Sequence, residues 1–289
     1  LSLYEMNRPT EVAMSSSSSD VLDAWIIGRM HDVVRASTDG YDNYRLDDAT
    51  RPIDQFVDDL SVWYVRRSRS KLKGDEGEES QARTYGVLAY VLHVFSRAIA
   101  PVMPFIAERI YMTIKGEKES VHLESWPEAP ESNKESQEVM TKVRNIVTDA
   151  LALRTQAKLA VRQPLQKLTL KDELPAEYHQ ILLDELNVKE LAFDTSLSAS
   201  CVLDTTITEV LQQEGDVRNL MRAVQDARKE QGLTPKDVII LITSYEIPEQ
   251  FRADLMSTCR VSSMKHGEGK FTAETSTGTV SFDIEASVA

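Results

Sequence analysis

The sequence is poor in the residues that build metal sites and disulfide frameworks. It holds two cysteines, Cys201 and Cys259, and five scattered histidines in 289 residues. Two thiols cannot form a four-cysteine zinc site, and no histidine stands in an HExxH-type spacing. We therefore expect two reduced, unpaired thiols and no bound metal, as in most intracellular proteins.

Long apolar runs are absent as well. No stretch approaches the ~20 apolar residues that a membrane-spanning helix needs, and the first residues show no basic stretch followed by an apolar run. The patterns of a phosphate-binding loop, a dinucleotide-binding fold and a nucleophile elbow are also missing. These absences predict a cytoplasmic protein that carries no catalytic constellation in this sequence. Its length favours two domains.

Positive charge is in deficit overall, with 33 basic against 46 acidic residues and a formal net charge of −13. The cations nevertheless gather in two islands. Residues 60–73 carry five cations and no acid, directly behind Trp63 and Tyr64, and residues 141–171 carry seven cations against one acid, Asp149. Overall acidity does not exclude nucleic-acid binding, because the distribution of charge matters more than its sum.

Apolar spacing in the first half is helical. Residues 1–19, which include a run of five serines, are expected to be an irregular lead-in. Apolar residues then recur at steps of three and four, with Asp20 as a candidate N-cap and Pro52 as a candidate kink. The pattern predicts an antiparallel bundle over residues 20–160, with helices at 20–38, 46–73, 80–99, 105–115 and 135–157.

Near residue 165 the apolar period changes from helical spacing to alternation, which predicts strands. The chain is therefore expected to be mainly α, with a smaller α+β domain over residues 161–289. Its strands are expected at 165–170, 188–193, 201–203 and 237–244, with a hairpin over 270–284. Its helices are expected at 177–187, 209–231 and 248–259.

The first basic island suits a nucleic-acid strand. On a helix Arg66, Arg69 and Lys73 share one face, with Arg67 and Lys71 in a second row beside it. Cations neutralise phosphates, and an aromatic ring can stack on an unpaired base. A solvated helix end explains the same cations, since positive charge near a helix C-terminus is favourable.

Two neighbouring features have simpler interpretations. Trp63 continues the apolar row of Phe56 and Leu60, so we expect its ring in the core. The adjacent acids Asp58 and Asp59 diverge on a helix, which favours solvation or a salt bridge to arginine over a catalytic pair.

The second island offers a weaker candidate site. Arg154 and Lys158 stand one turn apart at the end of the predicted fifth helix, and Arg162 and Gln163 follow just before Pro164. These side chains could make a second phosphate contact. From spacing alone, a helix end followed by a turn is the simpler interpretation.

The segment FVDDLSVWYVRRSR, residues 56–69, resembles a hallmark of the isoleucyl-tRNA synthetases, which are class I aminoacyl-tRNA synthetases. In that family it lies in the helical anticodon-binding domain. Further segments are similar to the family and follow in its order: LDAWIIGRM (22–30), APVMPFIAERIY (100–111), SVHLESWP (120–127), VRQPLQKL (161–168), LNVKELAF (186–193) and the stretch 203–233.

The resemblance implies the C-terminal portion of an isoleucine–tRNA ligase. In its catalytic domain the family activates isoleucine with ATP and Mg, using the HIGH and KMSKS motifs. It edits mischarged tRNA in an inserted domain. Those segments are not in this sequence, so we expect it alone to be inactive and to hold no cofactor. The implied partners are the anticodon stem-loop of isoleucine tRNA and the catalytic and editing domains of the same chain.

The resemblance places the tRNA-binding residues in the two basic islands. The candidates are Tyr64, Arg66, Arg67, Arg69, Lys71, Lys73, Arg154, Lys158, Arg162 and Gln163. Two alternatives are the anticodon domain of a valyl-type synthetase and a helical scaffold or interaction protein without RNA binding. The scaffold predicts that Arg66, Arg67 and Arg69 pair with acids of neighbouring helices.

Overall fold

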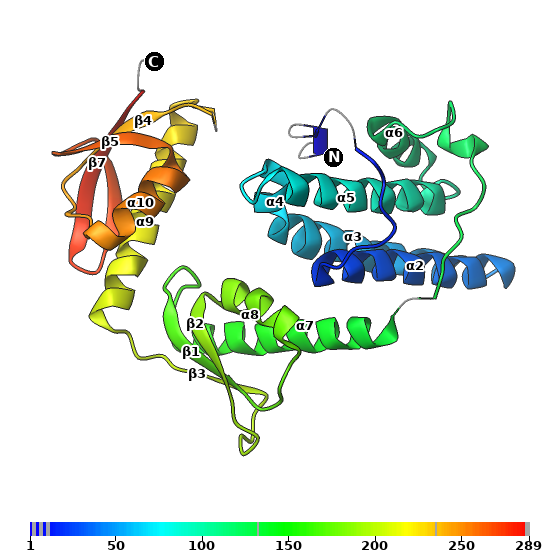
Figure 1. Cartoon of the computed structure of the whole chain (residues 1–289), viewed down its shortest axis with the longest axis horizontal. Helices are drawn as coiled ribbons and strands as arrows, with labels where there is room; N and C mark the ends of the chain where they lie inside the picture. The colour runs from blue at the N-terminus through cyan, green and yellow to red at the C-terminus, as the bar shows by residue number, and fades with distance from the viewer. Residues whose placement is uncertain (2–3, 6–7, 10–11, 132, 235, 287–289) are drawn as a thin grey trace. The chain divides into compact units, whose positions relative to one another are not determined.

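The chain folds into two compact units, Leu1–Lys142 and Val143–Ala289. The computed structural model (Figure 1) describes residues 1, 4–5, 8–9, 12–131, 133–234 and 236–286. The boundary between the units lies inside a helix, α7 (Lys134–Gln156), and not near residue 160, where the change in apolar period placed it. A helix can carry side chains of two cores along its length, so periodicity within it does not mark the boundary.

The first unit is helical, and its described residues contain no strand. This confirms the predicted bundle. Before α7 its elements are α2 (Val21–Asp42), α3 (Leu46–Asp58), a π-helix η1 (Asp59–Val65), α4 (Arg69–Lys73), α5 (Glu78–Ile99), α6 (Pro104–Ile114) and a 3₁₀ turn η2 (Val121–Leu123).

Local chemistry explains where these helices begin. Asp20 caps α2, because its carboxylate accepts hydrogen bonds from the backbone nitrogens of Leu22 (3.0 Å) and Asp23 (3.2 Å). Pro104 opens α6, where its missing N–H costs nothing. Pro52 lies within α3 without ending it.

The predicted single helix over 46–73 is wrong in one respect that matters for the site. A π turn contains more residues than an α turn, so it rotates the face that the helix presents to the core. Across η1 the buried positions are five apart, Asp59 and then Tyr64, and they continue at Ser68 and Leu72. Tyr64 therefore points into the core in place of Trp63, which is half-buried.

The second unit is α+β, as predicted, but its strands form two separate sheets (Figure 1). In the first sheet β1 (Leu165–Leu170) pairs parallel to β2 (Val188–Phe193) and antiparallel to β3 (Cys201–Leu203), in the order β2-β1-β3. In the second sheet β4 (Ile239–Thr243) pairs parallel to β5 (Val261–His266) and antiparallel to β7 (Gly278–Ala286). With β6 (Phe271–Thr275) beyond β7, the order is β5-β4-β7-β6.

The elements of the second unit follow the predicted ones closely. After α7 they are β1 (Leu165–Leu170), η3 (Ala176–Tyr178), α8 (His179–Leu186), β2 (Val188–Phe193), β3 (Cys201–Leu203), α9 (Glu209–Glu230), β4 (Ile239–Thr243), α10 (Glu249–Cys259), β5 (Val261–His266), β6 (Phe271–Thr275) and β7 (Gly278–Ala286). The strand that sequence reasoning missed is β5, which is polar because it lies at a sheet edge and buries only Val261 fully.

Candidate nucleic-acid interface

The first candidate site is the cationic segment, residues 66–73, at the end of the α3–η1–α4 stretch. Arg66, Arg69 and Lys73 are exposed, whereas Arg67 and Lys71 are half-buried. The Arg66 Nε donates a 2.8 Å hydrogen bond to the Val62 carbonyl one turn earlier, which orients the guanidinium along the helix. The surface thus presents three cations where a phosphate could reach them.

Tyr64 does not belong to that surface, contrary to its predicted role in RNA binding. It is 0% exposed, and its hydroxyl donates a 2.7 Å hydrogen bond to the Asp23 carboxylate. Asp23 is buried too and accepts a second hydrogen bond, 2.8 Å long, from the Ser18 hydroxyl. Burial raises the pKa of Asp23, and burial together with the Asp23 charge raises the pKa of Tyr64 well above its usual value. A ring held in this way cannot stack on a base.

Lys71 also serves the fold. Its ammonium lies 2.5 Å from the carboxylate of Asp20, and both side chains are largely buried. Burial alone would raise the pKa of Asp20, but the hydrogen bond and positive charge of Lys71 outweigh it and lower that pKa. The pair ties α4 to the residue that caps α2, so Lys71 helps to position the cationic segment.

The two adjacent acids, Asp58 and Asp59, lie in different environments. Asp59 is 3% exposed, and its carboxylate accepts a 2.8 Å hydrogen bond from the Arg29 Nε. The predicted salt bridge is thus confirmed for Asp59, while Asp58 is exposed. Trp63, predicted to be in the core, is instead half-buried, whereas its neighbour Tyr64 is fully buried.

In the second island Arg154 is a structural residue, and its predicted RNA contact is wrong. It is 1% exposed and sits among four backbone carbonyls, those of Ala160 (3.1 Å), Gln163 (2.9 Å), Leu186 (2.5 Å) and Asn187 (3.2 Å). Burial lowers its pKa to about 10. Its guanidinium therefore holds the loop 157–164 against the end of α8.

Gln163 is likewise engaged inside the protein. Its side-chain amide donates hydrogen bonds to the carbonyls of Leu211 (2.7 Å) and Pro164 (3.2 Å), and it is half-buried. Lys158 and Arg162 are exposed on the same loop. Of the four candidate residues in the second island, Lys158 and Arg162 are therefore the two that lie on the surface.

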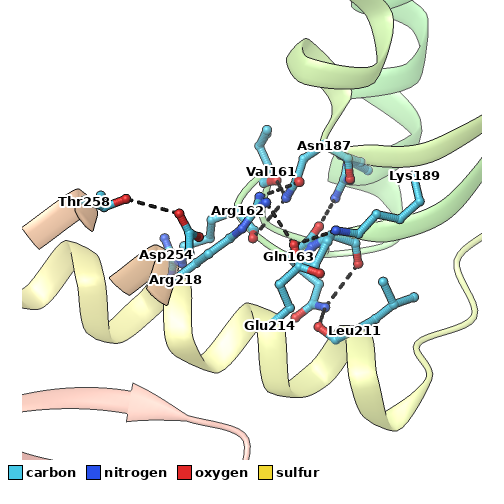
Figure 2. Close-up of polar contacts among 12 residues, drawn as sticks. Val161, Arg162, Gln163, Asn187, Lys189, Leu211, Glu214, Arg218, Asp254 and Thr258 are labelled. Carbon is cyan, nitrogen blue, oxygen red and sulfur yellow. Dashed lines mark hydrogen bonds and ion pairs between the residues drawn. The ribbon is translucent and has the colours of Figure 1, made fainter. Parts of the chain in front are cut away.

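A polar cluster that sequence reasoning missed fixes the backbone of this loop (Figure 2). Asn187 donates hydrogen bonds to the carbonyls of Val161 (3.0 Å) and Arg162 (3.1 Å), and accepts one from Arg218. Glu214 in turn pairs with Arg218 at 2.9 Å and with Lys189 at 2.7 Å. Glu214 and Arg218 are one helical turn apart, but their contacts with Lys189 and Asn187, and those of Asn187 with the loop, join residues 25 to 31 positions apart, which no local pattern reveals.

The described residues hold no group of three or more His, Cys, Asp or Glu side chains that could bind a metal ion. Cys201 and Cys259 are buried free thiols, as expected, and burial raises the pKa of Cys259 to about 11. In the part of the chain that the structure describes, no helix is long and apolar enough to cross a membrane.

A helical bundle that presents an exposed cationic segment is the arrangement expected of a helical RNA-binding domain. The comparison with known families agrees with this class. Residues 23–169, about half of the chain, match the family described as the anticodon-binding domain of tRNA ligase. The chain belongs to this family.

Its curated relatives include isoleucine–tRNA ligases. The chain is 36% identical over 190 residues to that of Clostridium tetani, 31% over 320 residues to that of Leifsonia xyli subsp. xyli, and 38% over 189 residues to that of Clostridium acetobutylicum. These matches cover 63%, 85% and 63% of this chain but only 18%, 28% and 18% of the relatives. The resemblance to isoleucyl-tRNA synthetases is thereby confirmed.

Proposed function

We propose that this chain is the portion of an isoleucine–tRNA ligase that holds the anticodon stem-loop of isoleucine tRNA. The observation that carries the proposal is the exposure of Arg66, Arg69 and Lys73 at the end of the segment that resembles a hallmark of the family. Phosphate contacts by such cations set the position of an RNA, and bases that leave a single-stranded loop are then available for stacking and hydrogen bonds.

Of the two neighbouring aromatic residues, Trp63 is the better candidate for stacking on a base, because it is half-buried while Tyr64 is fully buried. We assign the primary tRNA contacts to Arg66, Arg69 and Lys73, with Arg67 at their edge and Lys71 as a positioning residue. Lys158 and Arg162 supply a second cationic surface in the other unit. The scaffold alternative, which has no RNA-binding role, is less well supported, because residues 23–169 match the anticodon-binding domain of tRNA ligase.

The ligase reaction itself belongs to the longer protein. Isoleucine activation with ATP and Mg, and editing, need catalytic segments beyond those in this sequence, and translation places the protein in the cytoplasm. In this proposal the chain contributes binding and orientation: it holds the anticodon end of the tRNA while the catalytic domain acts on the other end.

A titration of the chain with isoleucine and valine tRNA transcripts at several salt concentrations tests the proposal. We expect tighter binding of the isoleucine transcript. The triple variant Arg66→Ala/Arg69→Ala/Lys73→Ala should bind less tightly, and the slope of log K against log salt should fall by about 0.7 to 0.9 for each lost phosphate contact. Its thermal stability should stay nearly the same, since exposed substitutions usually change stability by about 0.5 kcal/mol or less.

Arg222→Ala is the matched control, because Arg222 is an exposed arginine of α9 outside both islands, with a side chain 68% exposed. It should leave tRNA binding unchanged. Unchanged affinity and salt dependence in the triple variant would refute the assignment. Preferred binding of the valine transcript would favour a valyl-type domain. If the chain alone binds no tRNA, the same variants are compared in the full-length ligase, with aminoacylation as the readout.

A further inference from the structure

The second unit repeats one arrangement twice. In each half a long helix leads through a loop into a strand, a helix and a second strand parallel to the first, and a third strand pairs antiparallel on the other side (Figure 1). The first half uses α7, β1, α8, β2 and β3. The second half uses α9, β4, α10, β5 and β7, with β6 added at the edge.

A buried arginine occupies the same place in both halves. Arg228, 4% exposed, donates to the carbonyls of Thr234 (2.9 Å), Asp237 (2.8 Å) and Cys259 (3.1 Å). Arg154 donates in the same way to Ala160, Gln163 and Leu186. In each case the guanidinium joins the loop after the long helix to the last residue of the shorter helix.

The backbone turns around these arginines are also equivalent. The nitrogen of Leu159 donates to the Arg154 carbonyl, and that of Leu233 to the Arg228 carbonyl, each at 2.9 Å. The crossover helices both end in a left-handed residue, Asn187 (φ 48°) and Arg260 (φ 54°). Each of these carbonyls accepts from the first residue of the preceding strand, Leu165 at 3.0 Å and Ile239 at 2.9 Å.

The sequence supports the same correspondence at a spacing that changes by one residue. Leu174-Pro175 opens the first crossover and Ile247-Pro248 the second, and the buried Leu182 and Leu255 follow at the same distance. The shift is 73 residues here and 74 at the buried arginines. Agreement in topology, hydrogen bonds, backbone angles and spacing at once is not expected of two unrelated sheets.

We infer that the second unit is built from two copies of one β-α-β module, and that the first copy has gained an RNA phosphate contact at Lys158. Lys158 and Gly232 occupy the same left-handed position just after the long helix, with φ of 57° and 72°. Glycine accepts that conformation freely, whereas a lysine is disfavoured there. No atom lies within 4 Å of a Cβ added at Gly232, so packing does not distinguish the two positions.

Charge explains why the first copy keeps a lysine at a position that suits glycine. Residues 156–163 carry two cations, Lys158 and Arg162, and no acid. The matching residues 230–237 carry one cation, Lys236, and two acids. Arg154 and Asn187 fix the backbone of the first loop while both cations stay exposed, which suits contact with phosphate groups. This contact rests on the proposed function, since the phosphates are those of the bound tRNA.

Reciprocal variants, Lys158→Gly and Gly232→Lys, test the inference in the whole chain. Lys158→Gly should raise the unfolding midpoint of the second unit by about 2–4 °C and lower the salt slope of tRNA binding by about 0.7 to 0.9. Gly232→Lys should lower the midpoint by a similar amount and leave tRNA binding unchanged. All three tryptophans, Trp25, Trp63 and Trp126, lie in the first unit, so tryptophan fluorescence reports the unfolding of that unit alone. Far-ultraviolet circular dichroism reports both units, and its comparison with fluorescence gives the midpoint of the second unit.

The outcomes separate this inference from the proposed function. If Lys158→Gly raises the midpoint but leaves binding unchanged, Lys158 makes no phosphate contact, while binding that depends on Arg66 and Arg69 still supports the proposed function. If Lys158→Gly lowers the midpoint, or Gly232→Lys raises it, the two positions are not equivalent and the inference is overturned. If the wild-type chain binds no transcript, the contact at Lys158 is overturned for this chain, and the two midpoints still decide the duplication.

Discussion

The Tyr64 hydroxyl donates a 2.7 Å hydrogen bond to the Asp23 carboxylate, and both side chains are buried. This contact joins the π-helix to the first turn of α2, 41 residues away in the sequence. It fixes the rotation of the stretch that ends in the cationic segment, and so decides which of its side chains face solvent.

Tyr64→Phe should destabilise the first unit by about 1–3 kcal/mol, because it leaves the buried Asp23 with one donor fewer while keeping the ring. Urea unfolding followed by tryptophan fluorescence measures the change. Trp63→Phe is the control: Trp63 is half-exposed, and this substitution should cost less. The reverse order of the two effects would show that Trp63 is the core residue.

The first unit should lose stability as the pH falls from about 7 to 5.5. Burial, with a contribution from nearby arginines, lowers the pKa of His31 and His93 below 6.5. The unfolded chain therefore binds protons first as the pH drops through about 6.5, which favours unfolding. Above that pH both states hold neutral histidines and this dependence vanishes.

The double variant His31→Gln/His93→Gln should flatten the pH dependence. Glutamine keeps an amide that can bond to the Tyr90 hydroxyl, which lies 2.8 Å from His31 Nε2, but it does not titrate. Fluorescence-detected unfolding at each pH is the measurement. Equal slopes in the wild type and the variant would assign the pH dependence to other groups.

Gly215 should be needed for the contact between α9 and the loop of Gln163. A Cβ at Gly215 would lie 2.2 Å from the Gln163 Oε1, so Gly215→Ala must displace that side chain from the Leu211 carbonyl. We expect a loss of about 0.5–1.5 kcal/mol, the net value of an ordinary hydrogen bond. In a Gln163→Ala background the same substitution should cost almost nothing, and a full cost there would place the clash elsewhere.

Arg154→Lys and Arg228→Lys should destabilise the second unit by similar amounts, each about 1.5–3 kcal/mol. A lysine ammonium has one nitrogen and cannot reach the separate carbonyls that the planar guanidinium serves. Far-ultraviolet circular dichroism during urea unfolding measures both. The exposed Arg222→Lys should change stability by less than about 0.5 kcal/mol. A large loss for one buried arginine and none for the other would contradict their equivalence.

Periodicity predicted most elements correctly because burial on one face leaves a repeating apolar pattern. It located β1 and β2 with their bounds and the hairpin of β6 and β7. It failed at the π-helix, since one extra residue per turn leaves no mark in composition. It also failed at β5, where an edge strand buries little and therefore reads as polar.

The sequence also predicted only part of the candidate site. Charge clustering found both basic islands, and exposure retained Arg66, Arg69, Lys73, Lys158 and Arg162 as surface cations. Charge clustering could not show that four of the candidates serve the fold, because each has a hydrogen-bond partner far away in the sequence. The separations are 41 residues for Tyr64, 51 for Lys71, 32 for Arg154 and 48 for Gln163.

The sequence by itself determined the helical first half, the α+β second half, the two basic islands and the family. These follow from residue types and short spacings, which the chain carries before it folds. Only the tertiary structure decided which cations face solvent, which aromatic ring is buried, and that two modules share one arginine-held design. Those outcomes depend on contacts between residues that are distant in the sequence. A buried cation is held by hydrogen bonds or ion pairs within the protein, whereas an exposed cation stays accessible to a ligand such as RNA.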